Sequence, residues 1–178
     1  MSSVFQSSNI SVLISEEALQ QRLQELGQKI TSDYQGKELI VVGILNGCFV
    51  FLADLVRHID LPIITDFMGL SSYGSSTKSS GVVQITKDLS RPIEGLHMLI
   101  VEDIIDTGLT MSYLLENLET RKPASVRICS LLSKPSKHKV SIPIDYLGFS
   151  IEDKFVVGYG LDFDGRYRNL PHIGLMHL

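Results

Sequence analysis

Residues 96–110 read LHMLIVEDIIDTGLT, and this stretch decides the fold. Leu96 to Val101 is an apolar run typical of a buried strand, and a helical pattern begins at Thr110. Between them lie three carboxylates and the small residues Thr107-Gly108. A strand, an acidic turn and a helix in this order place unpaired backbone N–H groups at a helix N-terminus, where a phosphate binds well. Acidic side chains beside such a site suit sugar hydroxyls or a hard divalent cation, so the segment predicts a phosphorylated sugar as ligand.

A purely structural interpretation of this turn is also open. It makes Asp106 or Thr107 the N-cap of the following helix, with Asp103 favoured by the helix dipole. Capping accounts for one carboxylate. Three carboxylates this close together repel one another unless a cation or a ligand compensates.

Composition sets mild limits on function. The 178 residues are 44% hydrophobic and 20% charged, which predicts one domain spanning 1–178 with a substantial core. The formal charge of −4 and the lack of a basic tract argue against a nucleic-acid partner. No apolar stretch approaches the roughly 20 residues of a membrane helix, and the first residues lack a signal-peptide pattern. Cys48 and Cys129 lie in apolar runs without a CxxC pair, which favours reduced thiols in a cytoplasmic protein.

Hydrophobic periodicity predicts helices and strands in alternation. Ser15 is a plausible N-cap for an amphipathic helix that ends near Asp33. Further helices are expected at 48–58 and 110–121, and strands at 39–45, 63–69, 81–87, 96–101, 125–132, 146–149 and 155–159. This order predicts an α/β fold with a mainly parallel central sheet flanked by helices.

Four unusual turns follow the predicted elements. They are Asn46-Gly47, the acidic turn 102–110, Lys134-Pro135 and the segment after Tyr159. In open α/β sheets, ligands bind beyond the carboxyl ends of the strands, near the point where the strand order reverses. We therefore expect these turns to form one composite site.

The segment VEDIIDTGLT (101–110) resembles the ribose-5-phosphate loop of the type I phosphoribosyltransferases. Other stretches narrow the resemblance to the hypoxanthine-guanine phosphoribosyltransferases: VVGILNGCFVFLADLVR (41–57), SSYGSSTKSSG (71–81), LLSKPS (131–136) and DKFVVGYGLDFDGRYRNLP (153–171). The similarity runs from about residue 10 to the C-terminus in the family's motif order. It implies a Rossmann-like phosphoribosyltransferase fold, with a small hood over the purine site formed by the N-terminal segment and about 144–178.

The resemblance implies transfer of a 5-phosphoribosyl group from phosphoribosyl pyrophosphate to N9 of a 6-oxopurine. The 5′-phosphate would lie in the turn formed by Asp106, Thr107, Gly108, Leu109 and Thr110. Glu102 and Asp103 would face the ribose hydroxyls, directly or through Mg²⁺. Asp106 resembles the general base that takes the N7 proton of the purine.

The same resemblance assigns the purine and pyrophosphate contacts. Lys134 would donate to the purine O6, Phe155 would stack on the base and the backbone of Val156 would contact its edge. Asp162 resembles the family's second aspartate, which contacts metal and base. The pyrophosphate contacts would be Leu45, Asn46, Gly47, Ser72, Tyr73 and Arg168. An isolated phenylalanine is more often core, and Lys134, Asp162 and Arg168 would otherwise be ordinary surface charges.

Two loops complete the implied site. Loop 45–47 resembles the family's pyrophosphate loop, which often holds a cis peptide before its second residue. Asn46 stands where a lysine or arginine is common, and Cys48 replaces the usual serine or alanine. Residues of about 70–81 resemble a mobile lid, although a flexible linker explains their composition equally well. By the same resemblance, Leu45, Asn46 and the helix at 48–58 would form a subunit contact, which implies a homodimer or homotetramer.

Two rival functions remain open from the sequence. The first is a related enzyme that prefers xanthine. The second is a non-catalytic ribosyl-phosphate sensor, which should lack the base or the lid, or carry a basic face. Asp106, Lys134 and the Ser72-Tyr73 pair are all present and the net charge is acidic, which favours the enzyme.

Overall fold

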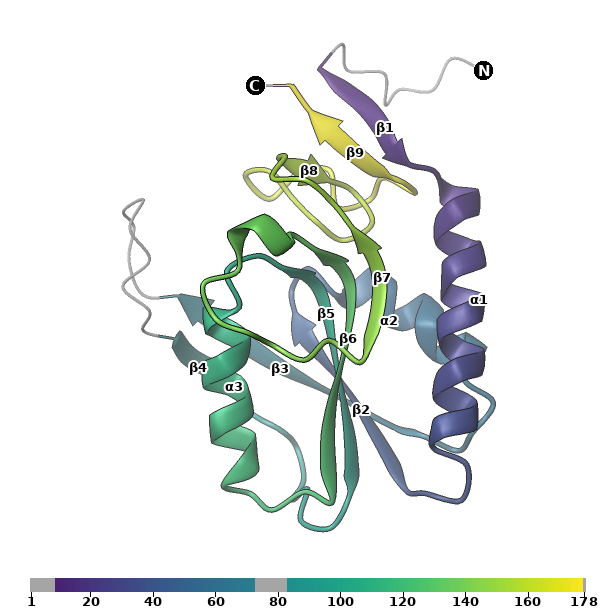
Figure 1. The fold of residues 1–178 in the computed structure, drawn as a ribbon, viewed down its shortest axis with the longest axis vertical. Helices are drawn as coiled ribbons and strands as arrows, with labels where there is room; N and C mark the ends of the chain where they lie inside the picture. The colour runs from purple at the N-terminus through teal and green to yellow at the C-terminus, as the bar shows by residue number, and fades with distance from the viewer. Residues whose placement is uncertain (1–8, 73–82, 178) are drawn as a thin grey trace.

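A six-stranded sheet in the order β4-β3-β2-β5-β6-β7 forms the centre of the molecule (Figure 1). The computed structural model describes residues 9–72 and 83–177. The strands are β2 (Leu39–Leu45), β3 (Ile64–Ser72), β4 (Val83–Lys87), β5 (His97–Ile105), β6 (Ser125–Ser133) and β7 (Tyr146–Ser150). Neighbouring strands are parallel except for β3 and β4. This confirms the predicted α/β fold with a mainly parallel sheet.

Helices cover both faces of this sheet (Figure 1). Helix α1 (Glu16–Asp33) and helix α2 (Phe49–Leu55), which continues as a 3₁₀ turn (Val56–His58), pack on one face. Helix α3 (Leu109–Glu119) packs on the other. The hydroxyl of Ser15 accepts a hydrogen bond from the N–H of Ala18 at 3.2 Å, so Ser15 is the N-cap of α1 as predicted. No helix in the described part of the chain is long and apolar enough to cross a membrane.

The core explains why the central strands are apolar throughout. Successive side chains of a strand point to opposite faces of the sheet. Val41 and Leu99 accordingly pack with α1 and α2, whereas Ile40 and Met98 pack with α3. Both faces of β2 and β5 are thereby buried, as expected for parallel strands between two helical layers.

A second sheet of three short strands in the order β1-β9-β8 lies above the carboxyl ends of the large sheet (Figure 1). Its strands are β1 (Ile10–Ile14), β8 (Val156–Val157) and β9 (Ile173–Met176). The sequence did not indicate β1 or β9. It also placed the hood boundary at about 144, whereas β7 pairs with β6 in the large sheet. The strand predicted at 155–159 ends after Val157, because Gly158 and Tyr159 turn the chain with positive φ angles of 95° and 49°.

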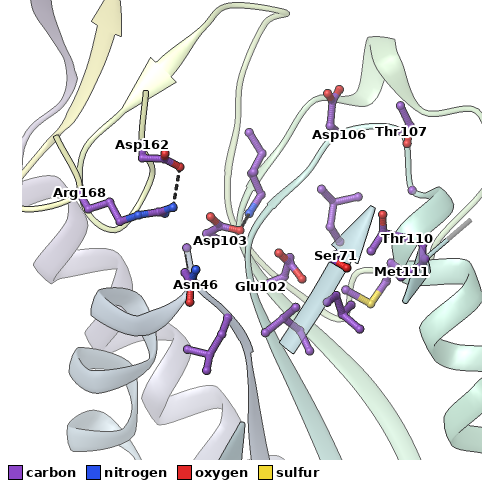
Figure 2. Close-up of a pocket in the computed structure, with 18 residues that line it drawn as sticks. Asn46, Ser71, Glu102, Asp103, Asp106, Thr107, Thr110, Met111, Asp162 and Arg168 are labelled. Carbon is purple, nitrogen blue, oxygen red and sulfur yellow. Dashed lines mark hydrogen bonds and ion pairs between the residues drawn. The ribbon is translucent and has the colours of Figure 1, made fainter. Parts of the chain in front are cut away.

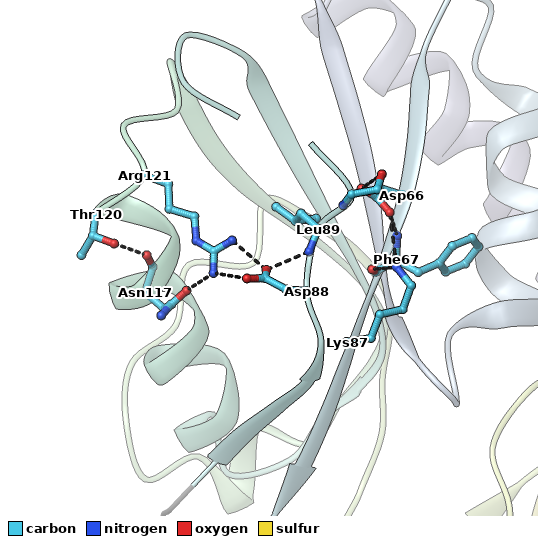
Figure 3. Close-up of polar contacts among 9 residues, drawn as sticks. Asp66, Phe67, Lys87, Asp88, Leu89, Asn117, Thr120 and Arg121 are labelled. Atoms are coloured by element: carbon cyan, nitrogen blue, oxygen red, sulfur yellow. Dashed lines mark hydrogen bonds and ion pairs between the residues drawn. The ribbon is translucent and has the colours of Figure 1, made fainter. Parts of the chain in front are cut away.

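Two aspartates, Asp66 and Asp88, form the hydrogen bonds that hold the antiparallel strands β3 and β4 to their surroundings (Figure 3). The buried carboxylate of Asp66 accepts hydrogen bonds from the backbone N–H and the hydroxyl of Ser90, at 2.7 and 2.8 Å. Asp88 accepts two hydrogen bonds from the guanidinium of Arg121, which follows α3. The segment after β4 is thus tied to β3 and to the end of α3. These contacts fix the two outer strands, β3 and β4, at this edge of the sheet.

Candidate active site

A cavity of about 340 Å³ opens at the carboxyl ends of β2 and β5 (Figure 2). The strand order reverses between these two strands, since β3 lies beyond β2 and β6 lies beyond β5. Ligands of open α/β sheets bind at such a point. The lining residues are Ile44, Leu45, Asn46, Gly47, Leu70, Ser71, Val83, Glu102, Asp103, Ile104, Ile105, Asp106, Thr107, Gly108, Thr110, Met111, Asp162 and Arg168. Three of the four predicted turns therefore meet here.

Glu102 and Asp103 belong to strand β5 and not to the turn, which corrects the sequence-based boundary at Val101. The strand continues because its backbone pairs with β6 as far as Ile105, opposite Ser133. Both carboxylates line the cavity. Burial, together with the adjacent charge of Asp103, raises the pKa of the Glu102 carboxyl well above its usual range. Polar or cationic groups of a ligand would relieve this unfavourable pairing.

Loop 45–47 lies directly against Asp103. The peptide bond between Leu45 and Asn46 is cis, as the family resemblance implied. A Cβ atom on Gly47 would lie 1.6 Å from Oδ2 of Asp103. Asp103 is 9% exposed, and its Oδ1 accepts a hydrogen bond from the N–H of Ile104 at 2.9 Å. Glycine at 47 is therefore required for the loop to approach this carboxylate.

The turn after β5 does not use Asp106 as a helix cap. The N-cap of α3 is Gly108, which has a φ of 81° and makes no side-chain capping bond. The hydroxyl of Thr107 accepts a single long hydrogen bond of 3.4 Å from the N–H of Leu109. Oδ1 of Asp106 is buried and has no hydrogen-bond partner among the described residues. The capping interpretation is therefore wrong for Asp106, a cavity-lining residue with one carboxylate oxygen that has no partner among the described residues.

An ion pair closes the opposite side of the cavity. Figure 2 shows Asp162 and Arg168 across from Asp106, Thr107 and Thr110, with Glu102 and Asp103 between the two groups. Nη2 of Arg168 lies 2.8 Å from Oδ1 of Asp162. This pair comes from the turn that follows β8, so the small sheet contributes side chains to a site built mainly by the large one.

Of the predicted purine contacts, Asp162 lines this cavity, whereas Lys134, Phe155 and Val156 lie outside its lining. Lys134 follows β6 and is 9% exposed, and its Nζ lies 3.6 Å from Oδ1 of Asp153. The other oxygen of Asp153 lies 3.3 Å from Nζ of Lys137. Phe155 is 41% exposed and packs edge to face against Phe163, with ring centroids 5.6 Å apart. Val156 is buried in β8.

A few predicted residues are placed elsewhere or are not described. Leu109 begins α3 and does not line the cavity. Ser72 ends β3, and Tyr73 and most of the predicted lid lie outside the described residues. Sequence reasoning missed Met111 and Val83, which line the cavity, and Asp153, which forms an ion pair with Lys134. The first two carry no signal beyond ordinary core residues, but the acidic neighbour of Lys154 and Phe155 was visible in the sequence.

Three of the cavity's carboxylates are candidates to hold a divalent cation. Glu102, Asp103 and Asp162 all line the cavity. Within the described residues, no three His, Cys, Asp or Glu side chains gather closely enough to hold a metal alone. Magnesium is typically held by one or two carboxylates together with water and substrate phosphates, so this sparse acidic set fits it.

Comparisons with known proteins place the chain in a family. Residues 13–164 match the model of the phosphoribosyl transferase domain. The chain is 53% identical over 165 residues to hypoxanthine-guanine phosphoribosyltransferase of Bacillus subtilis, covering 93% of this chain and 92% of that protein. It is 51% identical to hypoxanthine phosphoribosyltransferase of Haemophilus influenzae, covering 93% and 94%. A crystal structure of hypoxanthine phosphoribosyltransferase from Staphylococcus aureus superimposes with a TM-score of 0.94 at 48% identity, covering 99% and 96% of the two chains. The chain therefore belongs to the phosphoribosyltransferase family, among the hypoxanthine-guanine phosphoribosyltransferases.

Proposed function

We propose that this protein transfers the 5-phosphoribosyl group of phosphoribosyl pyrophosphate to N9 of hypoxanthine or guanine. The products are inosine or guanosine monophosphate and pyrophosphate, a reaction of purine salvage. The relatives' names support the activity, since the chain matches most of their length. The structural observation that best supports this activity is the acidic cavity, which lies where the strand order reverses and is bounded by the N-terminus of α3.

The ribose phosphate has a suitable place in this cavity. The first N–H groups of a helix have no partner within the helix, and the helix dipole favours an anion there. Gly108 and Thr110 line the cavity at the start of α3, beside the hydroxyl of Thr107. In our proposal they bind the 5′-phosphate, and Glu102 and Asp103 accept hydrogen bonds from the ribose hydroxyls.

Asp106 is our candidate for the general base. As N9 of the purine bonds to the ribose, its N7 proton has to leave. The unpartnered Oδ1 of Asp106 is an acceptor that no described residue occupies. A carboxylate held there takes the N7 proton, and its negative charge also stabilises positive charge that develops on the ribose.

Pyrophosphate and a divalent cation belong on the other side of the cavity. Loop 45–47 and Arg168 are our candidates for pyrophosphate contacts, and Glu102, Asp103 and Asp162 for the Mg²⁺ that accompanies it. When bound, this ion offsets negative charge on the leaving pyrophosphate. Asn46 supplies no side-chain cation, so the cationic contribution from the described lining residues rests on Arg168.

The purine contacts complete the proposal. Lys134 is almost buried and held beside Asp153, which suits an ammonium donating to one purine oxygen. The amino group of a 6-amino purine is a hydrogen-bond donor and would face the ammonium of Lys134, which is also a donor. The contact therefore favours 6-oxopurines, whose O6 is an acceptor. The exposed ring of Phe155 is available to stack on the base.

We further propose a cytoplasmic homodimer or homotetramer. Both cysteines are buried and free, which supports a reducing compartment. The side chain of Phe49, at the start of α2, is one of the exposed large hydrophobic groups, which supports a subunit contact at this helix.

A spectrophotometric assay tests the proposed reaction. Hypoxanthine, guanine, xanthine and adenine are each supplied with phosphoribosyl pyrophosphate and Mg²⁺. We expect turnover of hypoxanthine and guanine, loss of turnover when EDTA removes the cation, and little reaction with adenine. Absence of turnover with both hypoxanthine and guanine would refute the proposal. Turnover of xanthine alone would support the xanthine-preferring relative.

A further inference from the structure

The cavity has an unusual charge balance for a site that binds an anion. Four carboxylates line it: Glu102, Asp103, Asp106 and Asp162. Among the described lining residues, Arg168 is the one Lys or Arg side chain. The availability of this single guanidinium therefore matters for any ligand that carries phosphate groups.

Both terminal nitrogens of Arg168 have partners within its own turn. Its Nη2 lies 2.8 Å from Oδ1 of Asp162, and its Nη1 donates to the carbonyl of Gly160 at 2.7 Å. The second carboxylate oxygen of Asp162 accepts a hydrogen bond from the N–H of Gly165 at 2.8 Å. Both terminal nitrogens of Arg168 and both oxygens of Asp162 are thus occupied within residues 160–168.

The backbone of this turn does not depend on the ion pair. The N–H of Gly160 donates to the carbonyl of Arg168 at 2.9 Å, and Phe163 and Arg166 exchange two backbone hydrogen bonds. The hydroxyl of Tyr159 also donates to Asp54 on α2, which anchors the start of the turn to a helix that covers the large sheet. The Asp162 and Arg168 side chains, 31% and 28% exposed, can separate while the turn remains in place. A partly exposed pair of this kind contributes little to stability, so the two side chains separate at low energetic cost.

We propose that the Asp162–Arg168 ion pair is a latch that the pyrophosphate group has to open. This inference rests on the proposed function. Pyrophosphate takes the guanidinium of Arg168, and the carboxylate of Asp162 is released toward the cation that accompanies the pyrophosphate. Each partner of the pair exchanges one charged neighbour for another, so neither charge is left unpaired in the cavity.

The latch makes pyrophosphate binding depend on the cation. Without a cation, Asp162 competes with pyrophosphate for Arg168 and, once displaced, repels the bound anion. Removing the charge of Asp162 should therefore improve binding of metal-free pyrophosphate. This is the opposite of what removal of a productive ligand contact would do.

Calorimetric titration of the full chain with pyrophosphate in EDTA tests the latch. We expect Asp162→Asn to bind metal-free pyrophosphate about tenfold more tightly than the unmodified protein, a gain of one well-made charge-assisted contact. The matched control is Asp164→Asn, which removes the same charge from an exposed position of the same turn. Its φ of 50° is one that asparagine tolerates, and we expect less than about a twofold change.

A second pair of variants separates the latch from general electrostatics. In an Arg168→Ala background, Asp162→Asn should improve binding less than it does in the unmodified protein, because only the repulsion between Asp162 and the anion is then left to remove. The latch is overturned if Asp162→Asn weakens metal-free binding, matches Asp164→Asn, or leaves binding unmeasurable. Failure of the proposed function looks different, because the unmodified protein would then not turn over hypoxanthine or guanine.

Discussion

The two ends of the central sheet treat their polar groups in opposite ways. At the amino end, Nη1 of Arg127 donates to Asp33 at 3.2 Å and to the hydroxyl of Tyr146 at 2.9 Å. That hydroxyl in turn donates to Asp33 at 2.7 Å. At the carboxyl end, Asp106 has a buried oxygen without a partner among the described residues. The amino end joins Asp33, Arg127 and Tyr146 in one network beside the unpartnered hydroxyl of Tyr34, whereas the carboxyl end leaves carboxylates for a ligand.

The difference separates stability from function. A satisfied network of unlike charges stabilises the folded chain, whereas neighbouring unpaired carboxylates destabilise it until a ligand arrives. Substitutions at the amino end should therefore change the free energy of unfolding and leave catalysis alone. Substitutions at the carboxyl end should do the reverse. Four predictions test this contrast.

The largest expected effect follows from Asp106→Asn at the carboxyl end. Losing the proposed base should lower kcat by about 10²–10⁴-fold. Binding of phosphoribosyl pyrophosphate should change little, and the melting temperature should not fall, because the substitution removes a charge with an unpartnered oxygen. Steady-state kinetics, calorimetry and thermal melts measure the three quantities. Equal losses in kcat and in binding would contradict the role of Asp106 as base.

Gly47→Ala is expected to have the next largest effect. The new Cβ would lie 1.6 Å from Oδ2 of Asp103, so the carboxylate or the loop has to move. A displacement of about 1 Å in a reactive site reduces catalysis by up to about 10²-fold, so we expect kcat/KM for phosphoribosyl pyrophosphate to fall by about 10- to 100-fold.

A glycine at the other end of the sheet provides the control. Gly36 precedes β2, has a φ of 73° and has no atom within 4 Å of an added Cβ. Gly36→Ala should lower stability by about 1–2 kcal/mol through its left-handed backbone, with kinetics unchanged. If both alanine variants lost activity alike, the contrast between the two ends would fail.

Several elements could be predicted because their signal is local. Helix α1 shows a capping serine and apolar residues at helical spacing, and β2 is a continuous apolar run. Both were predicted at their observed bounds. The cavity segments 45–47 and 102–110 were found because short motifs in a fixed order identify this family, although their assigned roles remain proposals.

Other features depend on contacts between distant segments. Strands β1 and β9 pair Ile10 with Met176, and neither strand has a length or alternation that would reveal it alone. The acidic end of β5 reads as a turn, but its pairing with β6 makes it a strand. The partnership of Lys134 with Asp153 likewise depends on how two loops meet in space.

Tyr146→Phe tests the closed network at the amino end. The substitution removes the hydroxyl that joins Asp33 and Arg127 and leaves those two groups in direct contact. We expect a loss of about 1 kcal/mol in the free energy of unfolding, measured by urea denaturation, with kcat and KM unchanged. Tyr113→Phe, on the exposed face of α3, is the matched control. A change in kcat/KM for Tyr146→Phe would show that the amino end also serves catalysis.

The smallest effect is expected for Tyr34→Phe, which tests a polar group that the amino-end network leaves out. The hydroxyl of Tyr34 is buried without a hydrogen-bond partner among the described residues, so its removal at neutral pH should change stability by less than about 0.5 kcal/mol. Burial raises the pKa of Tyr34 from its ordinary value of 10.0 to about 12. The folded state then resists ionisation more than the unfolded state does. The resulting stability is fully present below pH 10 and is lost as the pH rises through about 12.

Urea denaturation of the unmodified protein and of Tyr34→Phe between pH 8 and pH 12 measures this loss. The phenylalanine ring keeps its contacts with Lys37 and Arg127 and cannot ionise. We therefore expect the free energy of unfolding of the variant to fall less steeply with pH above about pH 10. The two slopes should differ by the contribution of one titrating proton. Tyr146 is retained in the variant, and its raised pKa leaves a residual alkaline loss. If the free energy of unfolding fell equally steeply with pH in the two proteins, the hydroxyl of Tyr34 would have to contact solvent or a base. The amino end would then not exclude solvent from this hydroxyl.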